Sequence, residues 1–353
     1  MVTRYREIES GIGYARSAMG MDERHVEAVD YRINIRGNVD DEGAAVPRRF
    51  LEVFSQGRPT PRGDGSGRLE LAETLSGGAN PQVARVFVNR LWGWVFGTGL
   101  VATPSDFGKL GDPPSHPELL DRLAIEFQQE GWSTRRMLRR MVTSRAFRQS
   151  GVVDPKGAEL DPGNRLLHHY PTRRLEAEAI RDSLLAVSGR LDRRLYGPPI
   201  NPYRVAEDAA KRLYSGPLDG DGRRSIYMTM SIMEPPKFLV GFNLPDLKLP
   251  TGRRDVTNVP AQALIMLNDP FVAAMAGHWG ERLVGDGSAD PAERIERMFR
   301  VALGRKPDAD ELAAWVEAAT KIADSGSDPM SQPVVWTELA HAMFNTKEFI
   351  YYR

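Results

Sequence analysis

The segment Arg173–Asp182, with the sequence RRLEAEAIRD, concentrates carboxylates and guanidinium groups that could carry acid–base chemistry. On a helix, Arg174 and Glu178 would stand four residues apart and Glu178 and Arg181 three apart, so both pairs could form contacts. A carboxylate beside guanidinium groups can act as a general acid or base, or the array can clamp an anionic ligand. The same spacing also suits a salt-bridged structural helix, so both interpretations stay open.

His116 offers a different kind of acid–base group. It lies in the sequence Ser115-His-Pro-Glu118, which has the pattern of a capping box with the Ser115 hydroxyl at the N-cap. The positive end of a helix dipole favours a neutral imidazole, which could act as a base or as a hydrogen-bond donor. The candidate catalytic residues are therefore His116, Arg174, Glu178, Arg181 and Asp182.

The structural alternative makes a definite prediction for three of these side chains. If Arg174, Glu178 and Arg181 serve stability, they form one connected, partly buried ion-pair network that joins the central helices to the C-terminal ones. Under the catalytic alternative, His116 and Glu178 instead converge in a cleft.

A second set of polar and aromatic residues could bind a partner. Asn89 and Arg90 lie inside Pro81–Phe96, which is apolar almost all round and is expected to be the most buried helix of the chain. Buried there, both side chains would need partners, and Asp106 or Asp112 could pair with Arg90. The candidate binding residues are Asn89, Arg90, Trp92, Arg254, Gln262 and Asn268.

The composition excludes several classes of function. The 353 residues include no cysteine, which excludes thiolate nucleophiles, disulfides, cysteine-ligated zinc, iron–sulfur clusters and covalently attached c-type haem. The six histidines fall in no metal-binding pattern such as HExxH, and we expect no metal site. Lys+Arg and Asp+Glu are equal at 47 each, which argues against a general nucleic-acid binder. No run of about 18 apolar residues occurs, so no membrane span is expected.

Hydrophobic periodicity predicts a mainly α fold, a multi-helix globular domain with a few short β-strands and a long irregular segment rich in proline and glycine. Residues 1–28 are expected to be an N-terminal tail or the remnant of an upstream domain, with residues 1–17 packing poorly. Residues 29–196 should form a first helical lobe with a short strand at its start, and 197–256 an irregular segment with one strand. Residues 257–353 should form a C-terminal helical lobe.

Caps, prolines and glycines mark where the individual elements should begin and end. The predicted strands are Val29–Arg36 and Ser225–Ser231. The predicted helices are Pro81–Phe96, a helix capped by Ser115 that ends at Gly131, one from Ser133 through Phe147, one from Thr172 to about Gly189, and the five helices Pro260–Leu267, Pro270–Val284, Pro291–Leu303, Ala309–Ala323 and Gln332–Asn345.

Several phrases of the sequence, in one order, resemble a known family. They include Asn89-Arg-Leu-Trp92, Gly97-Thr-Gly-Leu-Val101, Arg174–Asp182, Arg223-Arg-Ser-Ile-Tyr227 and Asn268-Asp-Pro270. From about residue 18 to its end, the chain is similar to the planctomycete-type domain of unknown function 1553. Members of that family commonly follow a companion domain, number 1549, and often a c-type cytochrome domain, in large exported proteins. The resemblance brings no established activity with it.

The resemblance implies a protein of the periplasm or cell envelope. The N-terminus lacks the apolar core of a secretory signal, so we expect the chain to be part of a longer protein. No cofactor is expected in this chain, and c-type haem is expected only on an upstream domain. Our first hypothesis is a non-catalytic module that binds the companion or cytochrome domain, or a polysaccharide. The alternative is a hydrolase or redox-coupled enzyme with an Arg/Glu/Asp/His cleft.

Overall fold

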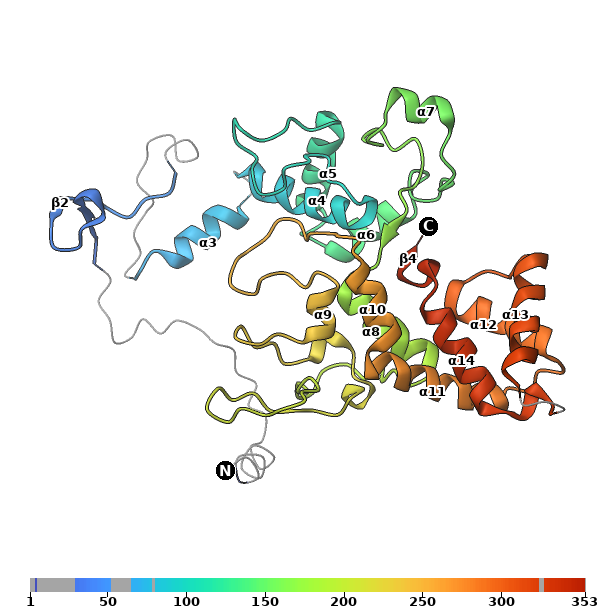
Figure 1. The fold of residues 1–353 in the computed structure, drawn as a ribbon. Coiled ribbons are helices and arrows are strands. Elements are labelled where there is room, and N and C mark those ends of the chain that lie inside the picture. The colour runs from blue at the N-terminus through green and yellow to red at the C-terminus, as the bar shows by residue number, and fades with distance from the viewer. Residues whose placement is uncertain (1–3, 5–28, 52–64, 78–79, 324–326, 353) are drawn as a thin grey trace. The chain divides into compact units, whose positions relative to one another are not determined.

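The computed structural model describes residues 4, 29–51, 65–77, 80–323 and 327–352 (Figure 1). The chain forms two compact units that divide between Pro171 and Thr172. We call the described residues of 29–171 the N-terminal unit and those of 172–352 the C-terminal unit. The predicted mainly α fold is confirmed, because helices dominate both units and the described strands form two two-stranded sheets. The tail and the poor packing predicted for residues 1–28 lie outside the described residues, Arg4 aside.

The strands of the N-terminal unit form a small exposed hairpin. Strand β1 (Arg32–Asn34) pairs antiparallel with β2 (Glu42–Ala45), with Arg32 opposite Ala45. The strand predicted over Val29–Arg36 is therefore shorter than expected, because Ile35–Gly37 forms a 3₁₀ turn in which Arg36 has a φ of 52°. A two-stranded hairpin without a buried face has little to stabilise a longer ladder.

The helices of the N-terminal unit pack around α4, which spans Pro81–Phe96 as predicted. Its start follows from local chemistry, since the Asn80 side chain accepts a hydrogen bond from the Gln82 amide and proline occupies the first helical position. Helix α4 packs against α5 and α6. The other helices of this unit are α3 (Arg68–Ser76), α5 (Pro117–Gln129), α6 (Thr134–Val142) and α7 (Pro155–Leu160).

The expectation that α4 is the most buried helix is wrong. Trp94 is 61% exposed and Phe87 is half-buried, although Leu91 is fully buried. Helix α4 buries six of its 16 residues, whereas α8 (Ala177–Ser188) in the C-terminal unit buries seven of 12. An apolar residue type does not fix the side of a helix on which its neighbours lie, so a tryptophan can remain on the outer face.

The C-terminal unit is built on two long helices that pack along their lengths, α11 (Pro270–Val284) and α14 (Pro333–Phe344) (Figure 1). Helix α8 packs against α11, and the rings of Trp279 and Phe344 stack at 5.3 Å inside the core. The remaining elements are β3 (Arg173–Arg174), α9 (Lys237–Gly241), α10 (Pro260–Asn268), α12 (Pro291–Leu303), α13 (Ala309–Ile322) and β4 (Tyr351–Tyr352).

Aspartate caps explain why the predicted starts of three helices are confirmed. The Asp269 side chain accepts from the Phe271 amide at 2.9 Å, and Asp290 and Asp308 cap α12 and α13 in the same way. Burial raises the pKa of Asp269 above its usual range. These caps are local, so the sequence alone carries the information for them.

Three further predicted elements differ from the structure. Arg173–Arg174 belongs to strand β3 and pairs with Tyr351–Tyr352, so α8 begins only at Ala177. Ser225–Tyr227 is a 3₁₀ turn instead of part of a strand. The helix capped by Ser133 ends at Val142, before the predicted end at Phe147. The long irregular segment is present, and it contains the short helix α9, which the sequence did not predict.

Candidate functional site

The polar residues at the start of α8 were the main candidates for chemistry, and Arg181 is the most buried of them at 4% exposed. Its guanidinium donates to the backbone carbonyls of Asp219 (2.8 Å) and Arg223 (2.9 Å) and to the Ser225 hydroxyl (3.3 Å). It also lies 5.4 Å from the centre of the Phe271 ring. Burial lowers the pKa of Arg181. Arg181 thus fastens the irregular segment to α8 through backbone atoms.

Arg174 has a similar role on the other side of the irregular segment. It is 7% exposed and donates to the carbonyls of Thr257 (2.8 Å) and Phe242 (3.1 Å) and to Asn243 Oδ1 (2.7 Å). Burial lowers the pKa of Arg174 as well. Because both of its terminal nitrogens donate to carbonyl and amide oxygens, this guanidinium holds the chain between α9 and α10.

Glu178 pairs with a residue that lies 76 positions later in the sequence. Arg254 donates to both of its carboxylate oxygens, at 2.6 and 3.1 Å, and lies 3.4 Å from Glu176. The hydrogen bonds from Glu178 raise the pKa of Arg254. About 30% of each side chain is exposed, 27% for Glu178 and 32% for Arg254, so this two-point ion pair lies at the edge of the irregular segment.

Asp182 completes the attachment of the irregular segment to α8. Its Oδ1 accepts from the backbone amide of Ser225 at 2.8 Å and from the Ser225 hydroxyl at 2.7 Å. Ser225 is 1% exposed, so its hydroxyl is inaccessible to a substrate in this conformation. Asp182 also lies 3.6 Å from Arg181.

The predicted network of Arg174, Glu178 and Arg181 is wrong. Each of the three side chains is engaged with a different part of the chain, and no ion pair among them occurs in the described structure. The physical reason is that Arg174 lies in β3, before the helix begins, so its spacing to Glu178 is not helical. The partners of the two buried arginines are backbone carbonyls, which residue types do not reveal.

His116 belongs to the N-terminal unit, whereas Glu178 belongs to the C-terminal unit, so their convergence stays a prediction. The residue at the N-cap of α5 is His116, not Ser115, because Pro117 occupies the first helical position. The Ser115 hydroxyl instead lies 3.0 Å from His116 Nδ1. The capping box predicted for Ser115 and Glu118 is therefore wrong, because the N-cap falls one residue later and its side chain makes no capping hydrogen bond.

The three binding candidates on α4 have different environments. Asn89 is 1% exposed, and its side chain makes two hydrogen bonds to the backbone of Val101, at 2.8 and 3.0 Å. Arg90 is exposed and makes no ion pair with Asp106, Asp112 or any other described acid, so that prediction is wrong. Trp92 is half-buried and packs against Phe96 at 4.3 Å. Asn89 thus fixes the turn that follows α4.

Among the later candidates, Gln262 is 3% exposed and reaches the Gly241 carbonyl (3.2 Å) and Asn243 Oδ1 (3.4 Å). Asn243 Oδ1 also accepts hydrogen bonds from Arg174 and from the Thr257 hydroxyl, so Asn243 is the centre of this set of hydrogen bonds. Asn243 was not identified from the sequence. Its φ of 66° marks the turn there, a conformation that asparagine tolerates. Asn268 is exposed and donates to its own helix, at the Leu264 carbonyl.

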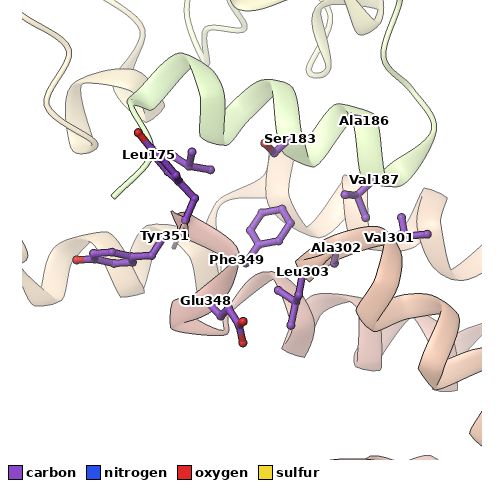
Figure 2. Close-up of a pocket in the computed structure, with 11 residues that line it drawn as sticks. Leu175, Ser183, Ala186, Val187, Val301, Ala302, Leu303, Glu348, Phe349 and Tyr351 are labelled. Carbon is purple, nitrogen blue, oxygen red and sulfur yellow. The ribbon is translucent and has the colours of Figure 1, made fainter. Parts of the chain in front are cut away.

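An open pocket, which the sequence did not predict, lies in the C-terminal unit and has a volume of about 420 Å³ (Figure 2). Figure 2 shows Ser183, Ala186 and Val187 on α8 opposite the end of α12, with Phe349 between them. Most of its lining is aliphatic or aromatic. The lining residues are Leu175, Ser183, Ala186, Val187, Val301, Ala302, Leu303, Glu348, Phe349, Tyr351 and Tyr352.

The carboxylate in this pocket is already paired. Arg305 donates to both oxygens of Glu348, at 2.9 and 2.6 Å, and to both oxygens of Glu311, at 2.6 and 2.7 Å. Its bonds to Glu311 and Glu348 raise the pKa of Arg305, and the guanidinium lowers the pKa of Glu311 to about 2. A shared guanidinium therefore compensates the charge of Glu348, and nine of the eleven lining residues are aliphatic or aromatic.

The described residues contain no group of three or more histidine, aspartate or glutamate side chains placed to hold a metal ion. In the part of the chain that the structure describes, no helix is both long and apolar enough to cross a membrane.

Comparison with known proteins identifies one family. The sequence model of PSD1, described as a protein of unknown function (DUF1553), matches residues 67–319. No curated protein and no solved structure matches the chain.

Proposed function

We propose, for a chain that belongs to the DUF1553 family of proteins of unknown function, that it is a non-catalytic binding module whose C-terminal unit receives an apolar side chain of a partner protein. The single observation that carries this proposal is the open pocket between α8, the end of α12 and the segment Glu348–Tyr352. Apolar surface that is transferred from water into such a cavity contributes roughly 25 cal/mol per Å² of buried area to the free energy of binding.

We take the occupant to be an apolar side chain because most of the lining residues are aliphatic or aromatic. Leu175, Val301 and Leu303 offer carbon surface, while the carboxylate of Glu348 is occupied by Arg305. A sugar ring needs several hydrogen-bonding groups at set positions to replace its water. An aliphatic or aromatic side chain needs only the complementary surface, and the two tyrosines can cover its exposed edge.

The candidate catalytic groups support the non-catalytic alternative. The guanidinium groups of Arg174 and Arg181 donate to backbone carbonyls, and Asp182 holds the backbone of Ser225. A catalytic group must come within hydrogen-bond reach of a substrate, and these groups are engaged in holding the fold. The hydrolase or redox-coupled alternative would need them released or would need a different set of residues.

The resemblance described above supports the identity of the partner. We take the partner to be the companion domain or the cytochrome domain of the same system, and the compartment to be the periplasm or cell envelope. Any c-type haem would then belong to the partner. Fractionation of cells that carry the full-length protein tests the compartment, and recovery in the cytoplasm would contradict it.

A substitution that fills the pocket tests the binding proposal. Ala186 lines the pocket but is exposed, so Ala186→Trp adds an indole there without overfilling the core. Ala313 on α13 is exposed and outside the pocket, so Ala313→Trp is the matched control. The probes are N-acetylphenylalaninamide and cellobiose, followed through the methyl resonances of Leu175, Val187 and Leu303 by NMR.

We expect the aromatic amide to shift these methyl signals in the unmodified chain and in Ala313→Trp, but not in Ala186→Trp. Cellobiose should shift none of them. Equal shifts in Ala186→Trp and the unmodified chain would reject the pocket as the binding site. Shifts with cellobiose alone would reject an apolar ligand.

A further inference from the structure

The N-terminal unit carries a concentration of arginines that neither the fold nor the proposed function uses. Residues 133–150, STRRMLRRMVTSRAFRQS, contain six arginines and no acid, in a chain whose net charge is zero. Arg140 is paired with Glu126 and Glu130. The other five are exposed and make no ion pair with any described residue: Arg135, Arg136, Arg139, Arg145 and Arg148. We call these five residues the arginine surface.

The arginine surface works against the stability of α6. Arg135 and Arg136 lie in the first turn, where the positive end of the helix dipole disfavours cations and favours acids. Arg139 lies four residues from Arg135 and three from Arg136, so like charges meet on one helix face. A sequence selected for helix stability alone would place glutamates here, and this one keeps positive charges together.

The opposite face of α6 is committed to the core of its unit. Met137 and Met141 are buried, and α6 packs against α4. Helix α6 therefore has no free apolar face to insert into a lipid surface, which an amphipathic membrane-binding helix needs. Its arginines can bind a ligand only through charge and hydrogen bonds.

The surroundings of the arginine surface also argue against a nucleic acid and against an acidic protein as the ligand. The one aromatic residue of the segment, Phe147, packs edge-on against Phe96 and Tyr170, so no base-stacking platform accompanies the charges. Among residues 133–150, Val142 is the one large apolar side chain classed as exposed, at 38%. An acidic protein partner would usually add apolar anchor contacts at the centre of its interface.

We propose that the arginine surface binds a carboxylated or sulfated polysaccharide. Such a chain repeats anionic groups along a polar backbone and needs no apolar anchor. Guanidinium groups match carboxylate and sulfate oxygens with two parallel hydrogen bonds. Arg135 and Arg139 are separated by about 6 Å along the helix axis, at about 1.5 Å per residue, so neighbouring anions of one chain can be bound together.

The test compares two triple variants with the same change of charge. The first is Arg135→Gln, Arg136→Gln and Arg139→Gln, which removes three members of the arginine surface and keeps good helix formers. The control is Arg32→Gln, Arg194→Gln and Arg300→Gln, at exposed arginines that are each paired with an acid and lie outside residues 133–150. Circular dichroism confirms that both variants fold.

Binding is measured by interferometry to immobilised polygalacturonate and dextran sulfate, with neutral dextran, poly-L-glutamate and duplex DNA as comparisons. We expect the unmodified chain to bind both anionic polysaccharides, more weakly as salt rises, and the first variant to lose at least about tenfold in affinity. The control should stay within about twofold, because its arginines are already compensated by neighbouring acids.

Three outcomes would overturn the proposal. One is equal binding by the first variant and the unmodified chain, or an equal loss in the control. Another is tighter binding to poly-L-glutamate, which would identify an acidic protein as the partner. The third is tighter binding to DNA. None of these outcomes bears on the pocket of the C-terminal unit, which the Ala186→Trp experiment tests separately.

Discussion

Replacing Arg181 by methionine removes the guanidinium that fastens the irregular segment to α8 while keeping an unbranched side chain of similar length. The substitution leaves the buried carbonyl of Arg223 without this donor. It leaves the backbone carbonyl of Asp219 with one long hydrogen bond, from the Gly222 amide at 3.3 Å. Each buried acceptor that loses its donor costs about 1–3 kcal/mol. Removing a buried charge returns part of this, because burial penalises the charged form of Arg181 and lowers its pKa. The expected net loss is about 2–4 kcal/mol of unfolding free energy.

Arg190 provides the matched control because it binds the same residue from the surface. Its guanidinium donates to Asp219 Oδ2 at 2.9 and 2.6 Å, with 45% of its side chain exposed. Water screens the Arg190 guanidinium, although only 13% of the Asp219 side chain is exposed, so Arg190→Met should cost less stability than Arg181→Met.

The assay is thermal unfolding of the whole chain, followed by circular dichroism, together with limited proteolysis of the irregular segment. A unit of this size shifts its Tm by about 2–4 °C per kcal/mol, so Arg181→Met should melt roughly 5–15 °C lower. Cleavage should also appear first in the irregular segment. Equal melting temperatures for Arg181→Met and Arg190→Met would refute the idea that backbone carbonyls around a buried guanidinium hold this part of the fold.

Two further predictions concern the ion pairs. Glu311→Gln should lower the Tm at neutral pH, and this deficit should shrink as pH falls from about 4.5 toward 2, because the folded-state pKa of Glu311 is lowered to about 2 from 4.5. The ionised Glu311 carboxylate thus stabilises the fold above its unfolded-state pKa, and this stabilisation is lost in acid. A Tm deficit of Glu311→Gln that stays constant between pH 6 and 3 would contradict this. Glu178→Gln should cost only about 0–1 kcal/mol in urea unfolding, because its pair with Arg254 is partly exposed, and a loss of several kcal/mol would show that the pair is effectively buried.

The parts of the fold that the sequence predicted well are those decided by neighbouring residues. Helices α4, α11 and α12 begin and end where expected, because a capping side chain and a proline define each start. The start of α8 was misplaced because its preceding residues, Arg173–Arg174, pair with residues almost 180 positions away. No local pattern contains that information.

The candidate site also combines contacts that neighbouring residues decide with contacts that only the packing of distant segments decides. The burial of Asn89 was correctly expected from its position in an apolar helix, and its partner Val101 lies on the turn that follows. The partners of Arg174 and Arg181 are carbonyl oxygens, which every residue possesses, so residue types could not single them out. The pocket depends on α8, α12 and the last residues of the unit meeting in space, which is a property of packing.

The pairing of β3 with β4 has a mechanical consequence. Arg173 lies opposite Tyr352 in an antiparallel pair, so the first residues of the C-terminal unit lie beside its last described residues in this short ladder. A pulling force applied at Thr172 and at Tyr352 would load its hydrogen bonds one after another, inward to the bond that the Leu175 amide donates to the Ile350 carbonyl. Opening about three residues on each side would release roughly 20 Å of chain, at about 3.3 Å per residue. The ladder would therefore yield first and act as a short extensible tether, while the packed helices α11 and α14 stay unloaded.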